Sequence, residues 1–222
     1  MGVFLVRVVL ADRPGALGAV ASRIGSVRGD VIGVEIVERR SGRAVDEFQV
    51  ELAEESTVEL LVTEIEQVDG AAVEQVRPLP QGRRDPRTQA YAASLSLMDE
   101  RSPGGLLDRL AVVASGELDA GWSAVIDMAA HSNNAILGAH GRPPALTWLT
   151  ALAVDAAGSG GRAGQGADVA SAPLHNWDLL LVVGRPGWAF TATEEERLRA
   201  LASLADTRWV ELARCAHPTR IG

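Results

Sequence analysis

A proline-rich, charged segment near the middle of the sequence most constrains how this chain can fold. Residues 78–88 are Pro-Leu-Pro-Gln-Gly-Arg-Arg-Asp-Pro-Arg-Thr and show no apolar period. Segments of this composition typically connect domains. The 222 residues therefore predict a domain over residues 1–78, a linker over 79–89, a second domain over 90–214 and a tail over 215–222.

The overall composition is that of a globular protein, with 47% hydrophobic and 23% charged residues. A net charge of −8 argues against nucleic-acid binding, because phosphate groups require clustered cations. No apolar run approaches the roughly 20 residues that span a bilayer, and the first residues lack the basic-then-apolar order of a signal peptide. We expect a cytoplasmic protein whose partners include neither nucleic acid nor membrane.

The sequence contains no lysine, so all 21 basic residues are arginine. This absence excludes Schiff-base chemistry on a lysine amine, the P-loop lysine and the kinase strand lysine. The single cysteine, Cys215, excludes an intrachain disulfide and a thiolate metal cluster. The arginine- and alanine-rich composition also suggests a bacterial coding bias toward high GC content.

The first 78 residues alternate between strand-like and helix-like apolar periods. Pro14 supplies a favoured first helical position, and Ser56 with Glu59 forms a capping-box pattern. The expected strands cover residues 4–10, 31–37, 45–52 and 73–76, and the expected helices cover residues 17–27 and 58–68. The order βαββαβ predicts a ferredoxin-like α+β domain, an antiparallel sheet with two helices on one face.

The sheet face opposite the helices is expected to be partly apolar, through Leu5, Val9, Val31 and Val37. A sheet of about 75 residues with an uncovered apolar face tends to associate. We therefore expect a homodimer.

The junction between the first strand and helix has the sequence Asp-Arg-Pro-Gly-Ala-Leu. Together with the six elements in order, this Asp-x-Pro-Gly-x-Leu motif resembles ACT domains, small regulatory modules that bind amino acids. The resemblance covers residues 3–78. It implies an amino-acid pocket at Asp12, Arg13, Pro14, Gly15, Ala16 and Leu17, completed by a second chain's strand around Val31, Ile32 and Gly33. Some members of the family bind no ligand and only dimerise.

The physical chemistry of this loop agrees with such a pocket. Unpaired N–H groups and the positive dipole end of a helix suit an α-carboxylate. Gly15 allows close approach of a ligand to the backbone, and Asp12 can accept a hydrogen bond from an α-ammonium group. The alternative is that Asp12 only caps the helix and that Pro14 and Gly15 only turn the chain.

The second part has the expected order helix–helix–strand–strand–helix–loop–strand–helix. Helices are expected over residues 90–101, 105–115, 145–157 and from 193 onward, and strands over 121–128, 135–139 and 177–184. Its last part has an apolar strand, then Phe190, then an acidic helix start at Thr193. This order resembles the end of GAF domains, a small-molecule sensor fold. The resemblance covers residues 90–213 and implies a GAF-like antiparallel α+β domain.

No ligand of the GAF-like domain follows from the resemblance. The body of the domain has no cysteine for a bilin thioether, and a chain without lysine cannot contain the Asn-Lys…Phe pattern of cyclic-nucleotide binders.

Features of the second part that could suggest catalysis have simpler explanations. Residues 158–163 match G-x-G-x-x-A but lack a preceding strand, so they are interpreted as a surface loop. The four histidines match no zinc spacing, and the five tryptophans are typical of core or interface. We expect no catalytic residue, no metal and no cofactor.

The favoured hypothesis is a non-catalytic, dimeric regulatory sensor that binds an amino acid through its ACT-like domain, coupled to a GAF-like domain. Two alternatives stay open. One is a dimerisation scaffold without a ligand. The other is an enzyme with its site in residues 90–214 and the ACT-like domain as its allosteric arm.

Overall fold

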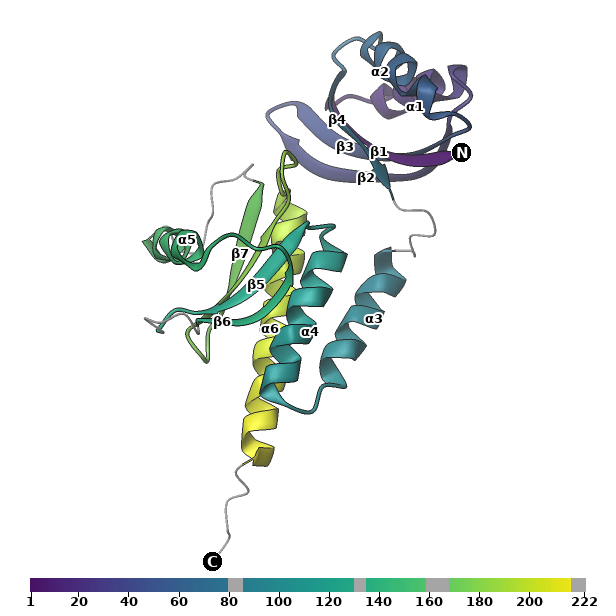
Figure 1. Cartoon of the computed structure of the whole chain (residues 1–222). Helices are drawn as coiled ribbons and strands as arrows, with labels where there is room; N and C mark the ends of the chain where they lie inside the picture. The colour runs from purple at the N-terminus through teal and green to yellow at the C-terminus, as the bar shows by residue number, and fades with distance from the viewer. Residues whose placement is uncertain (80–85, 130–134, 159–167, 217–222) are drawn as a thin grey trace, which may run out of the picture. The chain divides into compact units, whose positions relative to one another are not determined.

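The computed structural model describes residues 1–79, 86–129, 135–158 and 168–216 (Figure 1). Over these residues the fold is mixed α+β, with two four-stranded antiparallel sheets and six α-helices. The predicted α+β class is therefore confirmed. The chain divides into two compact units, Met1–Arg83 and Arg84–Gly222, each with its own sheet.

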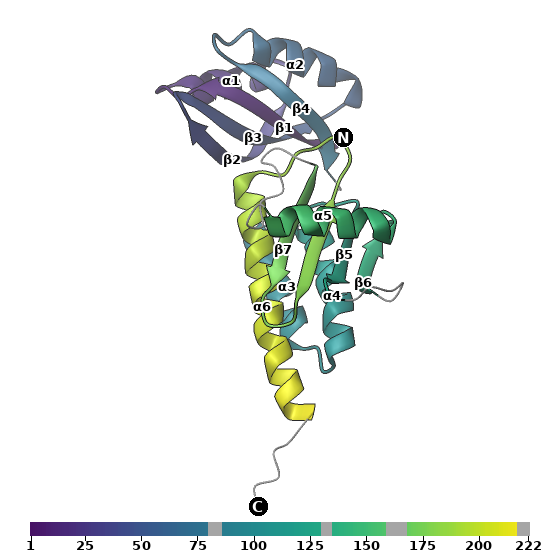
Figure 2. The same cartoon turned by 90° about the vertical axis from the view of Figure 1, so that its left-hand side faces the viewer.

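The first unit has the element order that the sequence predicts. Its elements are β1 (Gly2–Ala11), α1 (Ala16–Ser26), β2 (Asp30–Arg40), β3 (Arg43–Leu52), a short 3-10 helix (Glu55–Thr57), α2 (Val58–Glu66) and β4 (Ala72–Leu79). The strand order across the sheet is β2-β3-β1-β4, and α1 and α2 lie on one face of it (Figure 2). This architecture is consistent with a ferredoxin-like arrangement.

The alternation of apolar residues along β1 and β3 places one set of side chains against the two helices. This core is formed by buried residues of four elements, β1, α1, β3 and α2: Phe4, Val6, Val8, Leu10, Val20, Ile24, Phe48, Val50, Leu52, Leu61 and Ile65. Burial of this apolar set is the main contribution that holds the first unit together.

The start signals that the sequence offers at Pro14 and Ser56 do not begin the two helices of the first unit. Helix α1 begins at Ala16 rather than at Pro14, because Gly15 adopts φ +88°, a left-handed conformation that cannot continue a helix. Ser56 does not cap α2, since its Oγ donates to Glu54 Oε2 at 3.2 Å and the 3-10 helix intervenes. The expected capping box at Ser56 is wrong.

Most of the large exposed apolar side chains of the first unit lie on its edge strand β2 rather than at the expected outer-face positions, and Leu60 on α2 is exposed as well. Val31 packs against the helix-side core, because β-bulges after Val31 and Ile36 shift the register of β2. Three apolar side chains remain exposed on this strand: Ile32 at 50%, Val34 at 47% and Ile36 at 45%.

The second unit places its sheet between two layers of helices. Its elements are α3 (Pro86–Met98), α4 (Pro103–Glu117), β5 (Trp122–Asp127), β6 (Ile136–Gly141), α5 (Leu146–Gly158), β7 (Val169–Leu174), β8 (Leu179–Gly184) and α6 (Ala192–Ala216). The strand order is β6-β5-β8-β7. Helices α4 and α6 cover one face, α3 packs on both of them, and α5 covers the other face (Figures 1 and 2).

Strand β8 is buried on both faces, as its uninterrupted apolar sequence predicts. Leu181 and Val183 face α4 and α6, whereas Leu180 and Val182 face α5. The neighbouring strand β7 falls in the segment that the sequence assigned to a loop. Its Pro173 is tolerated because β7 is an edge strand, where a missing N–H leaves no partner unsatisfied.

Helix α6 also differs from its predicted limits. Its capping box uses Thr191 rather than Thr193: the Thr191 amide donates to Glu194 Oε2 at 2.9 Å, and the Glu194 amide donates to Thr191 Oγ1 at 3.2 Å. The helix continues to Ala216, so the first two residues of the expected tail are helical.

A buried arginine joins the end of β8 to the start of α6. Arg185 forms a bidentate ion pair with Glu194, in which Nη1 lies 2.8 Å from Oε1 and Nη2 lies 2.7 Å from Oε2. The Arg185 Cζ atom lies 4.1 Å from the centre of the Phe190 ring. Its guanidinium also donates to the carbonyls of Leu118, Trp188 and Ala189. The aromatic residue near an acidic helix start, noted in the sequence, is thus part of one buried cluster.

Candidate functional site

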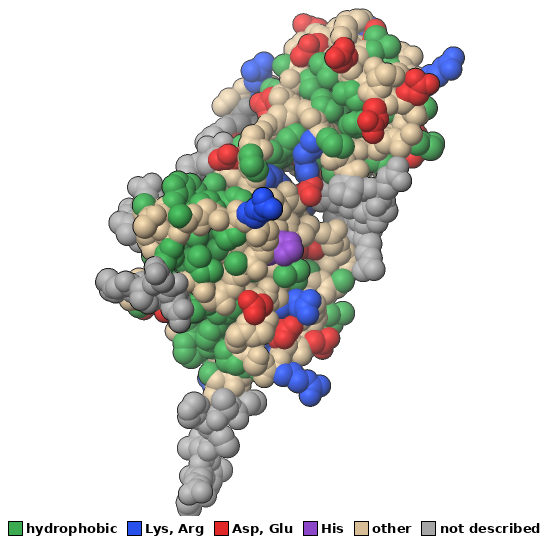
Figure 3. All heavy atoms as spheres, in the orientation of Figure 1, with side chains coloured by type: hydrophobic (Ala, Val, Ile, Leu, Met, Phe, Trp, Pro, Cys, Tyr) green, Lys and Arg blue, Asp and Glu red, His purple; other side chains and the backbone are tan. Residues whose placement is uncertain are grey.

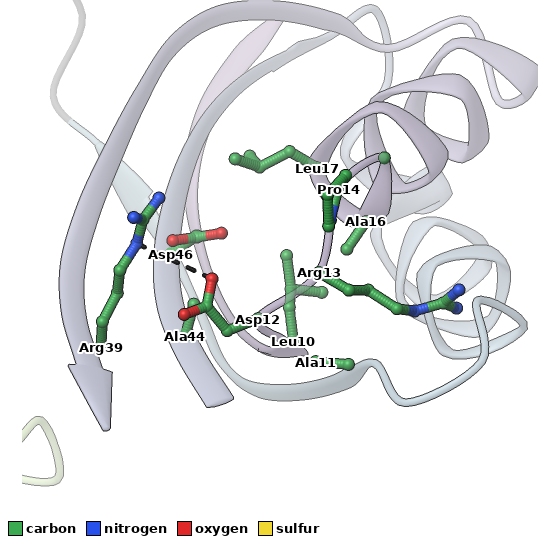
Figure 4. Close-up of a pocket in the computed structure, with 11 residues that line it drawn as sticks. Leu10, Ala11, Asp12, Arg13, Pro14, Ala16, Leu17, Arg39, Ala44 and Asp46 are labelled. Carbon is green, nitrogen blue, oxygen red and sulfur yellow. Dashed lines mark ion pairs between the residues drawn. The ribbon is translucent and has the colours of Figure 1, made fainter. Parts of the chain in front are cut away.

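A cavity of about 340 Å³ opens where β1 passes into α1 (Figure 4). Its lining comes from β1, the β1–α1 loop, the start of α1, β2 and β3: Leu10, Ala11, Asp12, Arg13, Pro14, Gly15, Ala16, Leu17, Arg39, Ala44 and Asp46. The structure brings all six predicted loop residues together around this cavity. Ile32 and Gly33, predicted to come from a second chain, do not line the cavity of their own chain.

Backbone hydrogen bonds fix the loop that forms one wall. The Asp12 amide donates to Gly42 O in the β2–β3 turn at 2.9 Å, and the Arg13 amide donates to Ala11 O at 2.8 Å. Gly15 then turns the chain into α1. In the first turn of α1 the Ala16 amide donates to Arg13 O at 3.3 Å, whereas the amides of Leu17 and Gly18 have no acceptor one turn earlier in the helix, and Ala16 and Leu17 line the cavity.

The charged side chains of the loop differ in direction. Asp12 lies toward β2, with its Oδ1 at 3.9 Å from Arg39 Nε (Figure 4). Both side chains are partly exposed, so this pair is weak and either partner can exchange it for a ligand. Arg13 extends away from Asp12 and Asp46, and its Nη2 lies 3.5 Å from Asp69 Oδ2.

Asp46 on β3 lines this site but was not predicted from the sequence. Its side chain is 1% exposed, and among the described residues its buried Oδ1 has no hydrogen-bond partner. Burial raises the pKa of the Asp46 carboxyl, Arg39 lowers it, and Asp12 raises it further. A signal existed in the sequence: Asp46 occupies the same alternating positions of β3 as the buried Phe48 and Val50.

Arg39 was also missed, and its position follows from strand pairing. It lies opposite Ala44 at the end of β2, which places it at the mouth of the cavity. The sequence alone gives no means of choosing Arg39 among the arginines around the β2–β3 turn. Figure 3 shows acidic side chains spread over the visible face of the first unit, so surface charge alone does not identify the site either.

The site thus combines two carboxylates, the Arg39 guanidinium and a helix start around a small cavity. Arg13 also lines the cavity, but its guanidinium contacts Asp69, and the other lining residues are apolar or glycine. The carboxylates can pair with ammonium or guanidinium groups, and the guanidinium and helix amides can bind a carboxylate. These are the groups needed to bind a zwitterion. Within the described residues, no cluster of His, Cys, Asp or Glu could hold a metal ion.

A second cavity, of about 290 Å³, lies between α3, α4 and α6 of the second unit. Its lining is mostly small or apolar, with one carboxylate and one guanidinium: Ala90, Ser94, Glu117, Arg197, Ala200, Leu201 and Leu204. The Ser94 hydroxyl of this lining donates to the backbone, to Ala90 O at 2.9 Å, rather than to the Glu117 carboxylate.

Other features of the second part have structural explanations or fall outside the described residues. Trp122 and Trp148 pack edge to face with their ring centres 6.2 Å apart, and the ring centres of Trp177 and Trp209 lie 5.3 Å apart. The glycine-rich match at 158–163 lies almost wholly outside the described residues, as do His131 and His217. No described helix has the length and apolar character needed to cross a membrane.

Comparisons with known proteins assign no family. No family model matches the sequence, and no curated protein matches it. An uncharacterised protein of Thermotoga maritima has 20% sequence identity and a TM-score of 0.29, covering 36% of this chain and 98% of its own. An unknown protein of Galdieria sulphuraria has 12% identity and a TM-score of 0.33, covering 94% of each chain. Neither likeness assigns a fold family or an activity.

Proposed function

We propose that the protein is a non-catalytic cytoplasmic sensor whose first unit, an ACT-like domain, binds a small amino acid in the cavity at the β1–α1 junction. The second unit is a GAF-like partner domain in this proposal, with no ligand assigned. The observation that carries the proposal is the combination of Asp12, Asp46, Arg39 and the start of α1 around one cavity of about 340 Å³.

The charges of the site define how an amino acid would bind. The α-carboxylate lies between Arg39 and the first-turn amides of α1, where positive charge is concentrated. The α-ammonium group pairs with Asp12, which exchanges its weak contact with Arg39 for the ligand. A cavity near the lower end of the usual range of roughly 300–1,000 Å³ suits a small metabolite rather than a nucleotide.

Two alternatives make different predictions. A ligand-free scaffold dimerises but is not stabilised by any amino acid. An enzyme requires a reactive group in the second unit, and the Ser94 hydroxyl in the described lining of its cavity donates to the backbone rather than to the Glu117 carboxylate.

Thermal unfolding of the full chain with each of the twenty amino acids tests the proposal. A ligand at one hundred times its dissociation constant stabilises the native state by about 2.7 kcal/mol. For a unit of this size we expect the transition of the binding unit to rise on the order of 10 °C. Asp12→Asn should reduce the shift, whereas Asp30→Asn, an exposed position on β2 outside the cavity, should keep it. If no amino acid at millimolar concentration moves the transition, the scaffold replaces the sensor.

A further inference from the structure

The binding of a neutral amino acid does not require the buried Asp46 carboxylate. Asp12 is already available for the α-ammonium group, and it lies closer to the solvent, with 41% of its side chain exposed. Asp46 is 1% exposed, and its Oδ1 has no partner among the described residues. A buried carboxylate oxygen without a partner is unfavourable unless another group completes its hydrogen bonds.

The negative charges around the cavity outnumber the positive charges directed into it. Arg39 from β2 is the one cation directed at the cavity among the described lining residues, and it faces two carboxylates, Asp12 and Asp46. Arg13 also lines the cavity, but its guanidinium contacts Asp69 outside it. The remaining lining residues, from β1, the loop, α1 and β3, are apolar or glycine: Leu10, Ala11, Pro14, Gly15, Ala16, Leu17 and Ala44.

We propose that the cavity selects basic amino acids, with the side-chain ammonium or guanidinium group of the ligand paired with Asp46. The inference rests on the proposed function and specifies its ligand class. A basic amino acid has two cations and one carboxylate, which complement the two carboxylates and one guanidinium of the site. The methylene groups of such a ligand lie along the apolar walls, including Leu10 and Leu17.

Selectivity follows from the burial of Asp46. A neutral amino acid of similar length fills the same space but leaves the Asp46 oxygen without a partner. A site with a buried polar group discriminates strongly against a ligand that cannot pair with it. A diamine supplies the cations but leaves Arg39 and the helix start without a carboxylate, so it should bind more weakly than the amino acid.

Calorimetric titration of the full chain tests the assignment with L-lysine, L-arginine, L-methionine, L-glutamate and cadaverine, which is lysine without its carboxylate. We expect L-lysine or L-arginine to bind at least tenfold more tightly than L-methionine and cadaverine, and L-glutamate to bind most weakly. Asp46→Asn should remove the preference for basic ligands and leave L-methionine binding unchanged or stronger. Asp30→Asn, the exposed control, should keep the preference.

Equal binding of L-methionine and the basic amino acids to the wild-type chain would overturn this inference and leave the proposed function in place. Cadaverine binding as tightly as lysine would also overturn it, since the carboxylate would then contribute nothing. Failure of every amino acid to bind at millimolar concentration would overturn both. The wild-type comparison decides the matter even if Asp46→Asn does not fold.

Discussion

Asp46 shows how a single side chain can link the stability of this protein to pH. Burial raises the pKa of its carboxyl in the folded state, so the folded chain holds this proton more tightly than the unfolded chain. Stability from this group is therefore greatest below the unfolded value near 3.8 and falls as the pH rises through the folded pKa. Above the folded pKa, the buried carboxylate therefore lowers stability.

Replacing this carboxylate should stabilise the protein without ligand. We expect Asp46→Asn to raise the free energy of unfolding at pH 7 by about 0.5–2 kcal/mol, the range typical of removing a destabilising group from a binding site. The gain should vanish near pH 3, where the wild-type carboxyl is protonated. Urea unfolding at both pH values measures the difference, and an equal effect at pH 3 and pH 7 would contradict the titration of Asp46.

Gly15 and Gly18 form a matched pair for testing the loop conformation. A Cβ atom at either position meets no atom within 4 Å, but only Gly15 has a positive φ, of +88°. Gly15→Ala should destabilise the first unit by about 1–2 kcal/mol through backbone strain alone. Gly18→Ala, within α1, should stabilise it by up to about 1 kcal/mol. Thermal unfolding of both variants measures the sign of each stability change, and equal changes would contradict backbone strain at Gly15.

At the scale of elements, Arg185 fixes where β8 ends and α6 begins. Arg185→Lys keeps the charge but loses the two-pronged contact with Glu194 and most of the carbonyl contacts. We expect a loss of about 2–4 kcal/mol, because the cluster is buried. The control is Arg109→Lys, whose pair with Glu100 is half exposed and should change stability by less than about 0.5 kcal/mol. Denaturant unfolding followed by circular dichroism compares the two, and similar losses would contradict the assigned role.

The elements also show which parts of the fold the sequence could predict. The alternating apolar residues of β1 and the uninterrupted apolar run of β8 were sufficient to predict both strands, because the burial of their side chains determines those patterns. Strand β7 was missed because Ser171 and Pro173 remove the strand signal, and an edge position tolerates both. The capping residue of α6 was misplaced by two positions because Thr191 and Thr193 both precede glutamates at suitable spacing.

Of the candidate site, only the residues that are contiguous in the sequence were predicted. The six residues from Asp12 to Leu17 are contiguous, so a motif identifies them together. Arg39 and Asp46 reach the cavity through strand pairing, whose register depends on two β-bulges that no local pattern specifies. Asp46 is one of the buried residues of β3, but a search for alternating apolar residues does not select it because it is polar.

At the scale of the whole molecule, the edge strand β2 is expected to determine the oligomeric state. It presents Ile32, Val34 and Ile36 exposed on a strand with one unpaired edge. We expect the full chain to sediment as a dimer at micromolar concentration and Val34→Lys to weaken the dimer at least tenfold. Leu60→Lys on α2 removes a comparably exposed apolar side chain and should have no effect. A monomeric wild-type chain, or equal effects of both substitutions, would exclude β2 as the interface.

All five tryptophans and the one tyrosine belong to the second unit, whereas the candidate site belongs to the first. The tryptophan and tyrosine fluorescence of this protein therefore arises entirely from the unit that does not contain the site. Amino-acid binding that stays local to the first unit leaves the emission spectrum unchanged. Any ligand-dependent change in intensity or wavelength would instead measure how strongly the two units communicate, without a label.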